Sequence, residues 1–174
     1  MKENLSRLLE SIYGESIQIK SVEAIGGGCI NETQAIKLSN GERVFLKYNP
    51  SPPKNFFIAE AKGLRLLAKP KNGPRVPHPL GISPESNPQF LLLEYIESSS
   101  SKSGFPSRFA RALAEMHRET QEQYGRDHEN FIGSTVQKND MESDGVTFFR
   151  ERRIRFQQKL ARKTRGLPKD VDRR

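Results

Sequence analysis

The feature that most constrains this chain is a run of three glycines at residues 26–28, placed between two strand-like runs. The flanking residues 17–25 and 32–38 carry the alternating, β-branched pattern of strands. Glycine lets the backbone turn sharply here and lets its amide groups approach an anion closely. The run is not a G-x-G-x-x-G motif, because Asn31 stands at the last glycine position, and no Walker A Gly-Lys-Ser/Thr follows. From the glycines alone, an ordinary hairpin turn and a phosphate-binding loop both remain open.

A lysine in the next strand-like run, residues 43–48, favours the second alternative. Alternation puts Phe45 and Lys47 on one face of this strand. In residues 55–69, Glu60 lies on the apolar stripe of a predicted helix, where a carboxylate is costly unless it is paired. We therefore expect a Lys47–Glu60 ion pair that leaves the lysine able to hold phosphates beneath the glycine loop. The alternative is a surface lysine and a helix-edge glutamate that never meet.

Several blocks of the sequence stand in the order of one known family. They are residues 26–33, 44–49, 56–68, 91–96, 113–118, 130–135 and 148–153. Together they resemble the fructosamine and ketosamine 3-kinases, relatives of the aminoglycoside phosphotransferases, from about residue 5 to the end. The resemblance implies an α+β fold. It would be a protein-kinase-like N-terminal lobe, an antiparallel sheet with a Glu-bearing helix, followed by the first helices of a truncated C-terminal lobe.

The resemblance also implies an activity, which is ATP-dependent phosphorylation of ketosamines on glycated proteins. ATP and Mg²⁺ would be the cofactors, and a small-molecule or protein-bound ketosamine would be the substrate. Lys47 would bind phosphates, and Glu60 would position it. The implied nucleotide contacts are Gly26, Gly27, Gly28, Asn31, Lys47 and, as a hinge for adenine, the backbone of Glu94, Tyr95 and Ile96. For the hinge, a buried strand that simply ends in polar residues is the alternative.

Three segments are expected along the chain. Residues 1–96 would form the nucleotide-binding lobe, 97–104 a flexible Ser-rich linker, and 105–174 the incomplete start of a helical lobe. Within the first segment we expect a short amphipathic helix over residues 3–13 that packs on the sheet. The proline-rich stretch 76–80 can form at most an edge strand or an extended connection.

The second half of the chain gives weaker signals. Residues 105–123 are expected to be helical, and residues 124–144 to be a long polar loop. A basic amphipathic helix should follow from Val146 and stop near Gly166. The sequence His117-Arg118-Glu119 resembles the start of a kinase catalytic loop, but its acid is Glu, no Asn follows at the required spacing, and it lies in a helical pattern. We expect no catalytic role for it.

Phosphoryl transfer also needs a residue that orients the acceptor hydroxyl and oxygen ligands for Mg²⁺. In the resembling family these lie in a His-Gly-Asp-Leu-Trp-type loop and a later Asp-Pro segment, and this sequence contains neither. We name no metal ligands and expect this chain alone to turn over little or no substrate, with Asp127 or Asp140 as the acids to consider if it does. The rival hypothesis is a non-catalytic nucleotide-binding or regulatory fragment that pairs with a separate C-terminal lobe.

The positive charge is concentrated at one end of the chain. Residues 150–174 hold 11 basic and 3 acidic side chains, whereas residues 1–149 hold 18 of each, so the net charge of +8 lies in the last 25 residues. A patch for nucleic acid or an acidic membrane is one interpretation. We favour solvated charges, or charges that face an acidic partner, and do not expect a nucleic-acid partner.

Cys29 is the single cysteine, so no intrachain disulfide can form. Nearby backbone amides could stabilise its thiolate, which predicts a redox-sensitive homodimer linked through Cys29; a small buried thiol is the alternative. No apolar run approaches about 18 residues, and the start of the chain lacks the apolar block of a signal peptide. We therefore expect no membrane span and a cytoplasmic location.

Overall fold

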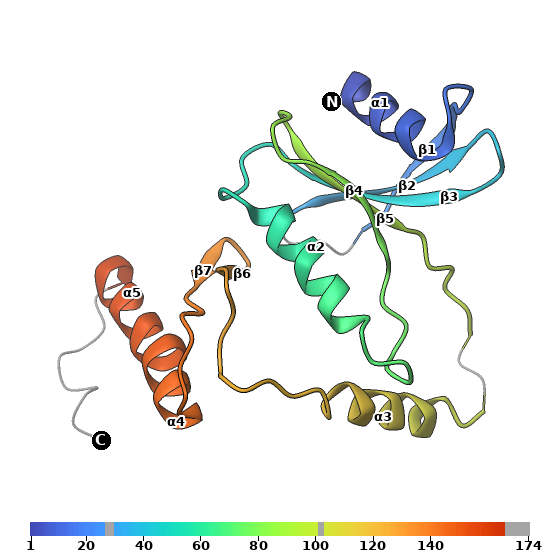
Figure 1. The fold of residues 1–174 in the computed structure, drawn as a ribbon. Helices are drawn as coiled ribbons and strands as arrows, with labels where there is room; N and C mark the ends of the chain where they lie inside the picture. The colour runs from blue at the N-terminus through green and yellow to red at the C-terminus, as the bar shows by residue number, and fades with distance from the viewer. Residues whose placement is uncertain (27–29, 101–102, 166–174) are drawn as a thin grey trace. The chain divides into compact units, whose positions relative to one another are not determined.

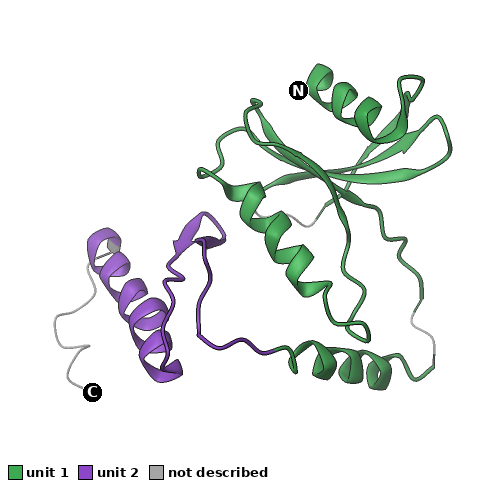
Figure 2. Ribbon diagram, in the orientation of Figure 1, with its two compact units in different colours: residues 1–119 green, residues 120–174 purple. Residues whose placement is uncertain are grey.

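The computed structural model describes residues 1–26, 30–100 and 103–165. The chain divides into two compact units, Met1–Glu119 and Thr120–Arg174 (Figure 2). The linker expected at residues 97–104 lies within the first unit, and the expected lobe boundary stays a prediction.

A five-stranded antiparallel sheet is the framework of the first unit (Figure 1). Its strands, in chain order, are β1 (Ile19–Ala24), β2 (Glu32–Leu38), β3 (Arg43–Asn49), β4 (Pro79–Ser83) and β5 (Gln89–Glu94). The strands lie side by side in the order β1-β2-β3-β5-β4, so the lysine-bearing strand is central and the strand that begins in the proline-rich segment is at the edge. An edge position suits proline, which lacks the amide hydrogen of a ladder donor.

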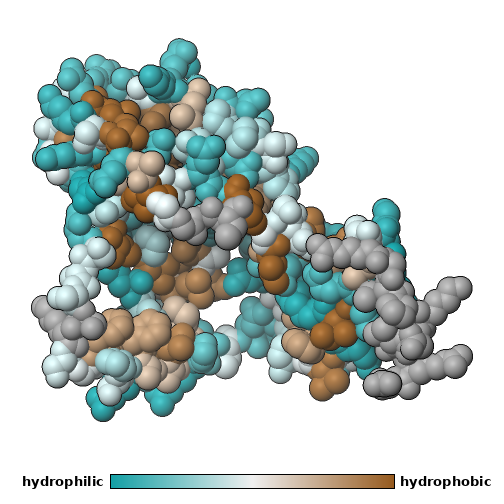
Figure 3. All heavy atoms as spheres, turned by 180° about the vertical axis from the view of Figure 1, so that it is seen from behind, coloured by the Kyte–Doolittle hydropathy of each residue, from teal (hydrophilic) through white to brown (hydrophobic). Residues whose placement is uncertain are grey.

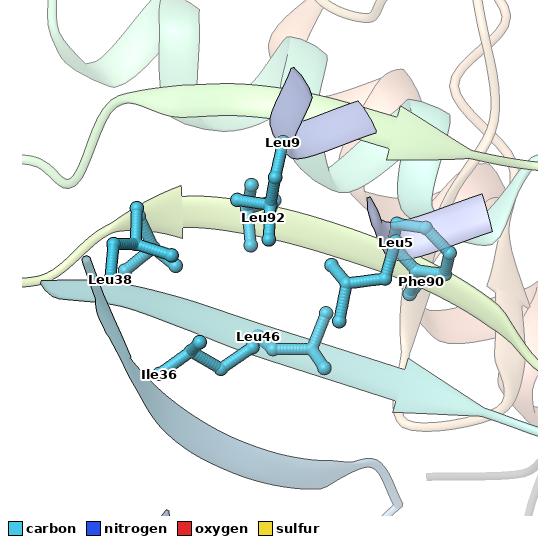
Figure 4. Packing of buried hydrophobic residues seen from close by; sticks show 8 residues of the cluster. Leu5, Leu9, Ile36, Leu38, Leu46, Phe90 and Leu92 are labelled. Atoms are coloured by element: carbon cyan, nitrogen blue, oxygen red, sulfur yellow. The ribbon is translucent and has the colours of Figure 1, made fainter. Parts of the chain in front are cut away.

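Helix α1 (Lys2–Tyr13) covers one face of this sheet and forms the main core with it. It ends at Gly14, whose φ of 97° is readily adopted only by glycine. Leu5 and Leu9 of the helix are buried against alternate side chains of three strands (Figure 4). Those strand residues are Ile36, Leu38, Val44, Leu46, Phe90 and Leu92. Each such side chain contributes about 1.5–3 kcal/mol when it is removed from water, so this layer dominates the stability of the unit.

Helix α2 (Phe56–Leu67) lies on the opposite face of the sheet (Figure 1) and packs against β4 and β5. Its Phe57 and Ala61 are buried. Because side chains alternate along a strand, the residues of β3 and β5 that do not face α1 face this helix. The α2 side of the sheet therefore carries Phe45, Lys47 and Leu93, and the candidate site forms there.

Helix α3 (Phe105–Met116) is shorter than the sequence predicted. The expected end at residue 123 is wrong, because the seven residues after Met116 are all polar and offer no apolar side chain to bury. His117 takes the C-cap position instead. Phe105 and Phe109 stack with their ring centroids 5.9 Å apart and remain exposed. Figure 3 shows apolar side chains on the surface of this helix.

The second unit consists of a small hairpin and a helical segment. Its elements are β6 (Asn130–Ile132), β7 (Thr135–Gln137), α4 (Gly145–Phe148), the π-helical η1 (Phe149–Arg155) and α5 (Phe156–Arg165). The basic helix predicted from Val146 is confirmed up to residue 165, and its expected stop lies outside the described residues. The expected loop over residues 124–144 is wrong, since it contains the hairpin. Three-residue strands are too short to give an alternation signal.

A buried asparagine is the centre of the second unit. Asn139 is only 3% exposed, and its Nδ2 donates to the carbonyl oxygen of His128 at 3.0 Å and to Asn130 Oδ1 at 2.9 Å. Its Oδ1 accepts a hydrogen bond from Arg153 Nη2 at 2.7 Å, and the Arg153 guanidinium lies 4.7 Å from the ring centroid of Phe148. One amide thus connects the hairpin to the helical segment.

Candidate functional site

A cavity of about 540 Å³ opens on the α2 side of the sheet, within the usual size range of small-molecule sites. It is lined by residues from β2, β3, β5, α2 and the neighbouring connections: Ile25, Gly26, Ile30, Asn31, Thr33, Phe45, Lys47, Glu60, Leu64, Pro77 and Leu93. Most of these side chains are apolar, and one ammonium and one carboxylate stand among them. Such a site suits a ligand with a flat apolar part and an anionic part.

The ion pair that the sequence predicted is present in this cavity. Lys47 Nζ donates to Glu60 Oε1, and the two side chains are only 22% and 26% exposed. Lys47 is held on the central strand, opposite Thr33 of β2 and Leu91 of β5. Glu60 projects from α2, one turn before Leu64. Because both charges are largely withdrawn from water, removing one partner leaves the other poorly compensated.

Paired hydrogen bonds close the base of the glycine-containing loop. The Ile25 amide donates to the Thr33 carbonyl oxygen at 3.0 Å, and Thr33 Oγ1 donates to the Ile25 carbonyl oxygen at 2.6 Å. Gly26 and Asn31, two of the predicted nucleotide contacts, line the cavity. Gly27 and Gly28 lie outside the described residues. Contact between these residues and a nucleotide stays a prediction.

Asn49 holds the far end of the same loop, and sequence reasoning missed it. This residue is 8% exposed, and its Nδ2 donates to the Ile30 carbonyl oxygen at 3.1 Å and to Asn31 Oδ1 at 3.0 Å. Its Oδ1 accepts from the Ser51 amide at 2.9 Å. Its position in the sequence could have indicated this role. Asn49 follows Lys47 by two residues, so alternation puts both side chains on one face of β3. The strand that carries the lysine therefore also anchors the loop.

The predicted hinge begins where β5 ends. The cavity reaches Leu93, but Glu94, Tyr95 and Ile96 are not among its lining residues. The Glu94 amide donates to the His78 carbonyl oxygen at 2.9 Å, so this donor is already used within the chain. A hydrogen bond from Arg75 lowers the pKa of the Glu94 carboxyl group. The base-binding role of these three residues stays a prediction.

The two acids considered as catalytic alternatives, Asp127 and Asp140, each lie near a basic side chain of the second unit. Asp127 Oδ1 lies 2.5 Å from His128 Nδ1, and Asp140 Oδ2 lies 3.5 Å from Arg152. Among the described residues, no group of three or more His, Cys, Asp or Glu side chains could hold a metal ion.

The basic segment is partly neutralised within its own unit. Arg150 and Arg155 both contact Glu151, in addition to the Asp140–Arg152 pair. The interpretation of the remaining charges as solvated, or as facing an acidic partner, stays a prediction. No helix in the described ranges has the length and apolar character needed to cross a membrane.

Cys29 lies outside the described residues. The disulfide-linked homodimer expected from it stays a prediction from the sequence.

Comparison with known proteins identifies relatives along nearly the whole chain. Two of them are chloroplastic protein-ribulosamine 3-kinases. The one from Oryza sativa subsp. indica is 37% identical over 150 residues, which are 84% of this chain and 43% of the relative. The one from Arabidopsis thaliana is 35% identical over 157 residues, 88% of this chain and 47% of the relative. The chain thus spans about half the length of the curated relatives that it matches. Because relatives are chloroplastic, the cytoplasmic location stays a prediction.

Solved structures give the same result for the fold. A crystal structure of a Haemophilus somnus protein assigned as a fructosamine-3-kinase matches with a TM-score of 0.84 and 32% identity, over 95% of this chain and 56% of the other. The resemblance to this structure confirms the predicted α+β fold, which corresponds to the N-terminal part of the kinase structure. The model of the family "Fructosamine kinase" matches residues 1–173. This chain belongs to the fructosamine kinase family.

Proposed function

We propose that this chain binds ATP in the cavity around Lys47 and Glu60, as the nucleotide-binding part of a ketosamine kinase. The observation that carries the proposal is the Lys47–Glu60 ion pair, formed between a central strand and the facing helix inside a cavity of ligand size. This combination is the one by which kinase-like folds hold phosphates. Family membership supports the use of ATP, with which Mg²⁺ would be bound.

The lining residues fit the two parts of the nucleotide. Phe45, Leu64 and Leu93 offer apolar walls for a purine ring, and the ammonium of Lys47 offers charge to the phosphates. Glu60 would keep the ammonium oriented, and the apolar walls would exclude water and so strengthen its attraction for anions. When bound, ATP would supply the phosphoryl group for transfer to the acceptor.

The proposed acceptor is the 3-hydroxyl of a ketosamine, free or on a glycated protein, so that phosphorylation would lead to removal of the sugar. The support is the family and the relatives named as ribulosamine kinases. Within this chain, the role that we assign is the binding and orientation of the phosphoryl donor.

Calorimetric titration of ATP with Mg²⁺ tests the proposal. Lys47→Met should weaken ATP binding by about 10- to 100-fold, because a hydrogen bond to a charged group contributes about 1.5–3 kcal/mol. Glu60→Gln should weaken binding less, because the ammonium remains but loses its orienting partner. Lys62→Met is the matched control, since Lys62 is an exposed lysine of α2 and should bind as the parent does.

Two results would contradict the proposal. One is a parent chain that binds no ATP, and the other is a Lys47→Met variant with the affinity of the parent and of Lys62→Met. ATP consumption with a fructosamine substrate, measured beside the titration, would separate binding from turnover.

A further inference from the structure

The residues that follow β5 are held in place by an arginine from another strand. Arg43, the first residue of β3, places its guanidinium 3.9 Å from the ring centroid of Tyr95. Its Nη1 also donates to both carboxylate oxygens of Glu97, at 3.0 and 3.2 Å. A third group, Glu23 of β1, lies 3.6 Å from Nη2. The guanidinium, carried by β3, thus contacts two residues of the segment after the sheet and one residue of β1.

A second arginine holds the preceding residue. Arg75 contacts Glu94 Oε1, and the His78 amide donates to Glu94 Oε2 at 3.3 Å. The backbone completes the link, since the Glu94 amide donates to the His78 carbonyl oxygen at 2.9 Å. Glu94 is therefore tied to the connection that contains Pro77, a residue of the cavity wall.

The contacts of Arg43 with Tyr95 and Glu97 act where the sheet no longer fixes the backbone. β5 ends at Glu94, so no strand ladder sets the path of the next residues. Isolated exposed ion pairs contribute little to stability. A guanidinium that stacks on a ring and donates to one carboxylate at the same time fixes geometry more than it adds stability, and lysine cannot replace it. The contacts are thus suited to setting a backbone path.

The segment after β5 follows directly from a residue that lines the cavity. Leu93 lines the cavity, and residues 94–96 continue the chain directly from it. We propose that Arg43 is a positioning residue that fixes the backbone after β5 so that it recognises the base of the bound nucleotide, without acting on its phosphates. This inference rests on the proposed function, and it separates base recognition from the phosphate binding assigned to Lys47.

Three probes with Mg²⁺ present test the separation: ATP, adenosine, which has the base alone, and inorganic tripolyphosphate, which has the phosphates alone. Arg43→Gln should weaken ATP and adenosine by the same factor, about 5- to 10-fold, and leave tripolyphosphate unchanged. Arg43→Lys should lie between, because it keeps the charge but loses the two-pronged donor. Lys37→Gln, at the exposed position opposite Arg43 in the β2–β3 ladder, is the control for charge and should change nothing.

A second measurement needs no nucleotide. Backbone nitrogen-15 relaxation should show order parameters at residues 95–97 that fall from about 0.85 in the parent to about 0.6 in Arg43→Gln, with those of β2 and β3 unchanged. This readout also shows that the variant has kept its fold.

The outcomes distinguish the two claims. A parent chain that binds no ATP would refute the proposed function and this inference with it. If the parent binds ATP, then equal losses for ATP and tripolyphosphate, or unchanged adenosine and ATP affinities in Arg43→Gln, would overturn the positioning role alone. Unchanged order parameters at residues 95–97 would overturn it as well.

Discussion

The two units of this chain bury different kinds of side chain. Among the described residues, the buried hydrophobic side chains all lie between Leu5 and Leu93, in the first unit. In the described part of the second unit, the residue that is buried is polar, Asn139. Large apolar side chains of that unit stay in water instead, with Val146 72% exposed and Phe149 59% exposed.

The difference shows what determines each structure. The first unit has an apolar layer between α1 and the sheet, so the hydrophobic effect specifies it strongly. The second unit depends on a few hydrogen bonds around Asn139 and Arg153, which contribute a net of about 1 kcal/mol each between neutral groups and about 1.5–3 kcal/mol where the guanidinium donates. We therefore expect the second unit to open at a lower free energy than the first.

The same substitution in both units should expose this contrast most clearly. Phe90 is fully buried, so Phe90→Ala should lower the free energy of unfolding of the first unit by about 3–5 kcal/mol. Phe149→Ala should change the free energy of unfolding by less than about 0.5 kcal/mol, because the ring is already in water. Urea unfolding followed by circular dichroism measures both. Equal changes in the free energy of unfolding of the two variants would contradict the proposed difference between the units.

Truncating the central amide should affect the second unit alone. Asn139→Ala removes the acceptor of Arg153 Nη2 and the donor to the His128 carbonyl group, and it should cost about 1–3 kcal/mol. Asn130→Ala removes one of the same hydrogen bonds and should cost less. Hydrogen exchange should show faster opening of β6, β7 and η1 with β2 and β3 unchanged. Faster exchange in the sheet would contradict two separate units.

Asn49, a buried asparagine of the first unit, should contribute both to the stability of the fold and to the affinity of the site for ATP. Asn49→Ala should reduce stability by about 1–2 kcal/mol and also weaken ATP binding, since Ile30 and Asn31 lose their anchor. Asn72→Ala, at an exposed turn, is the matched control. Unfolding and titration of the same samples separate the two effects. Unchanged ATP affinity would limit Asn49 to a structural role.

The smallest expected effect is the pH dependence of Glu94. The hydrogen bond from Arg75 lowers its pKa in the folded chain, so the unfolded chain takes up this proton first as the pH falls. The stabilisation is therefore present above the ordinary carboxyl pKa of 4.5 and is lost as the pH falls through the lowered pKa of the folded state.

Glu94→Gln should flatten the pH dependence of the free energy of unfolding below about pH 4.5 and cost less than about 1 kcal/mol near neutral pH. Glu85→Gln, at an exposed position between β4 and β5, is the control. A slope in this range that is the same in Glu94→Gln and the parent would show that the ion pair with Arg75 does not form in solution.

Most of the first unit could be predicted from the sequence because its patterns are long and periodic. Alternation in β3 and the helical stripe of α2 were sufficient to bring Lys47 and Glu60 together. The contacts of Asn49 and Arg43 could not be predicted in this way. They join residues 18 and 54 positions apart, and no local pattern specifies such side-chain hydrogen bonds.

The second unit was predicted less well, for the physical reason that separates it from the first. A unit centred on Asn139 gives no apolar periodicity, so the sequence pattern predicts a loop where the structure has the hairpin of β6 and β7. The early end of α3 has a related cause, because the polar residues after Met116 neither favour nor exclude a helix by pattern.

The central claim is that the cavity around Lys47 and Glu60 binds ATP. It is tested most directly by nuclear magnetic resonance of backbone amides during a titration with ATP and Mg²⁺. We expect shift changes concentrated on Ile30, Asn31, Thr33 and Lys47 and at the end of β5, and their loss in Lys47→Met. Changes concentrated instead on the basic residues 150–163, or none at all, would contradict the claim.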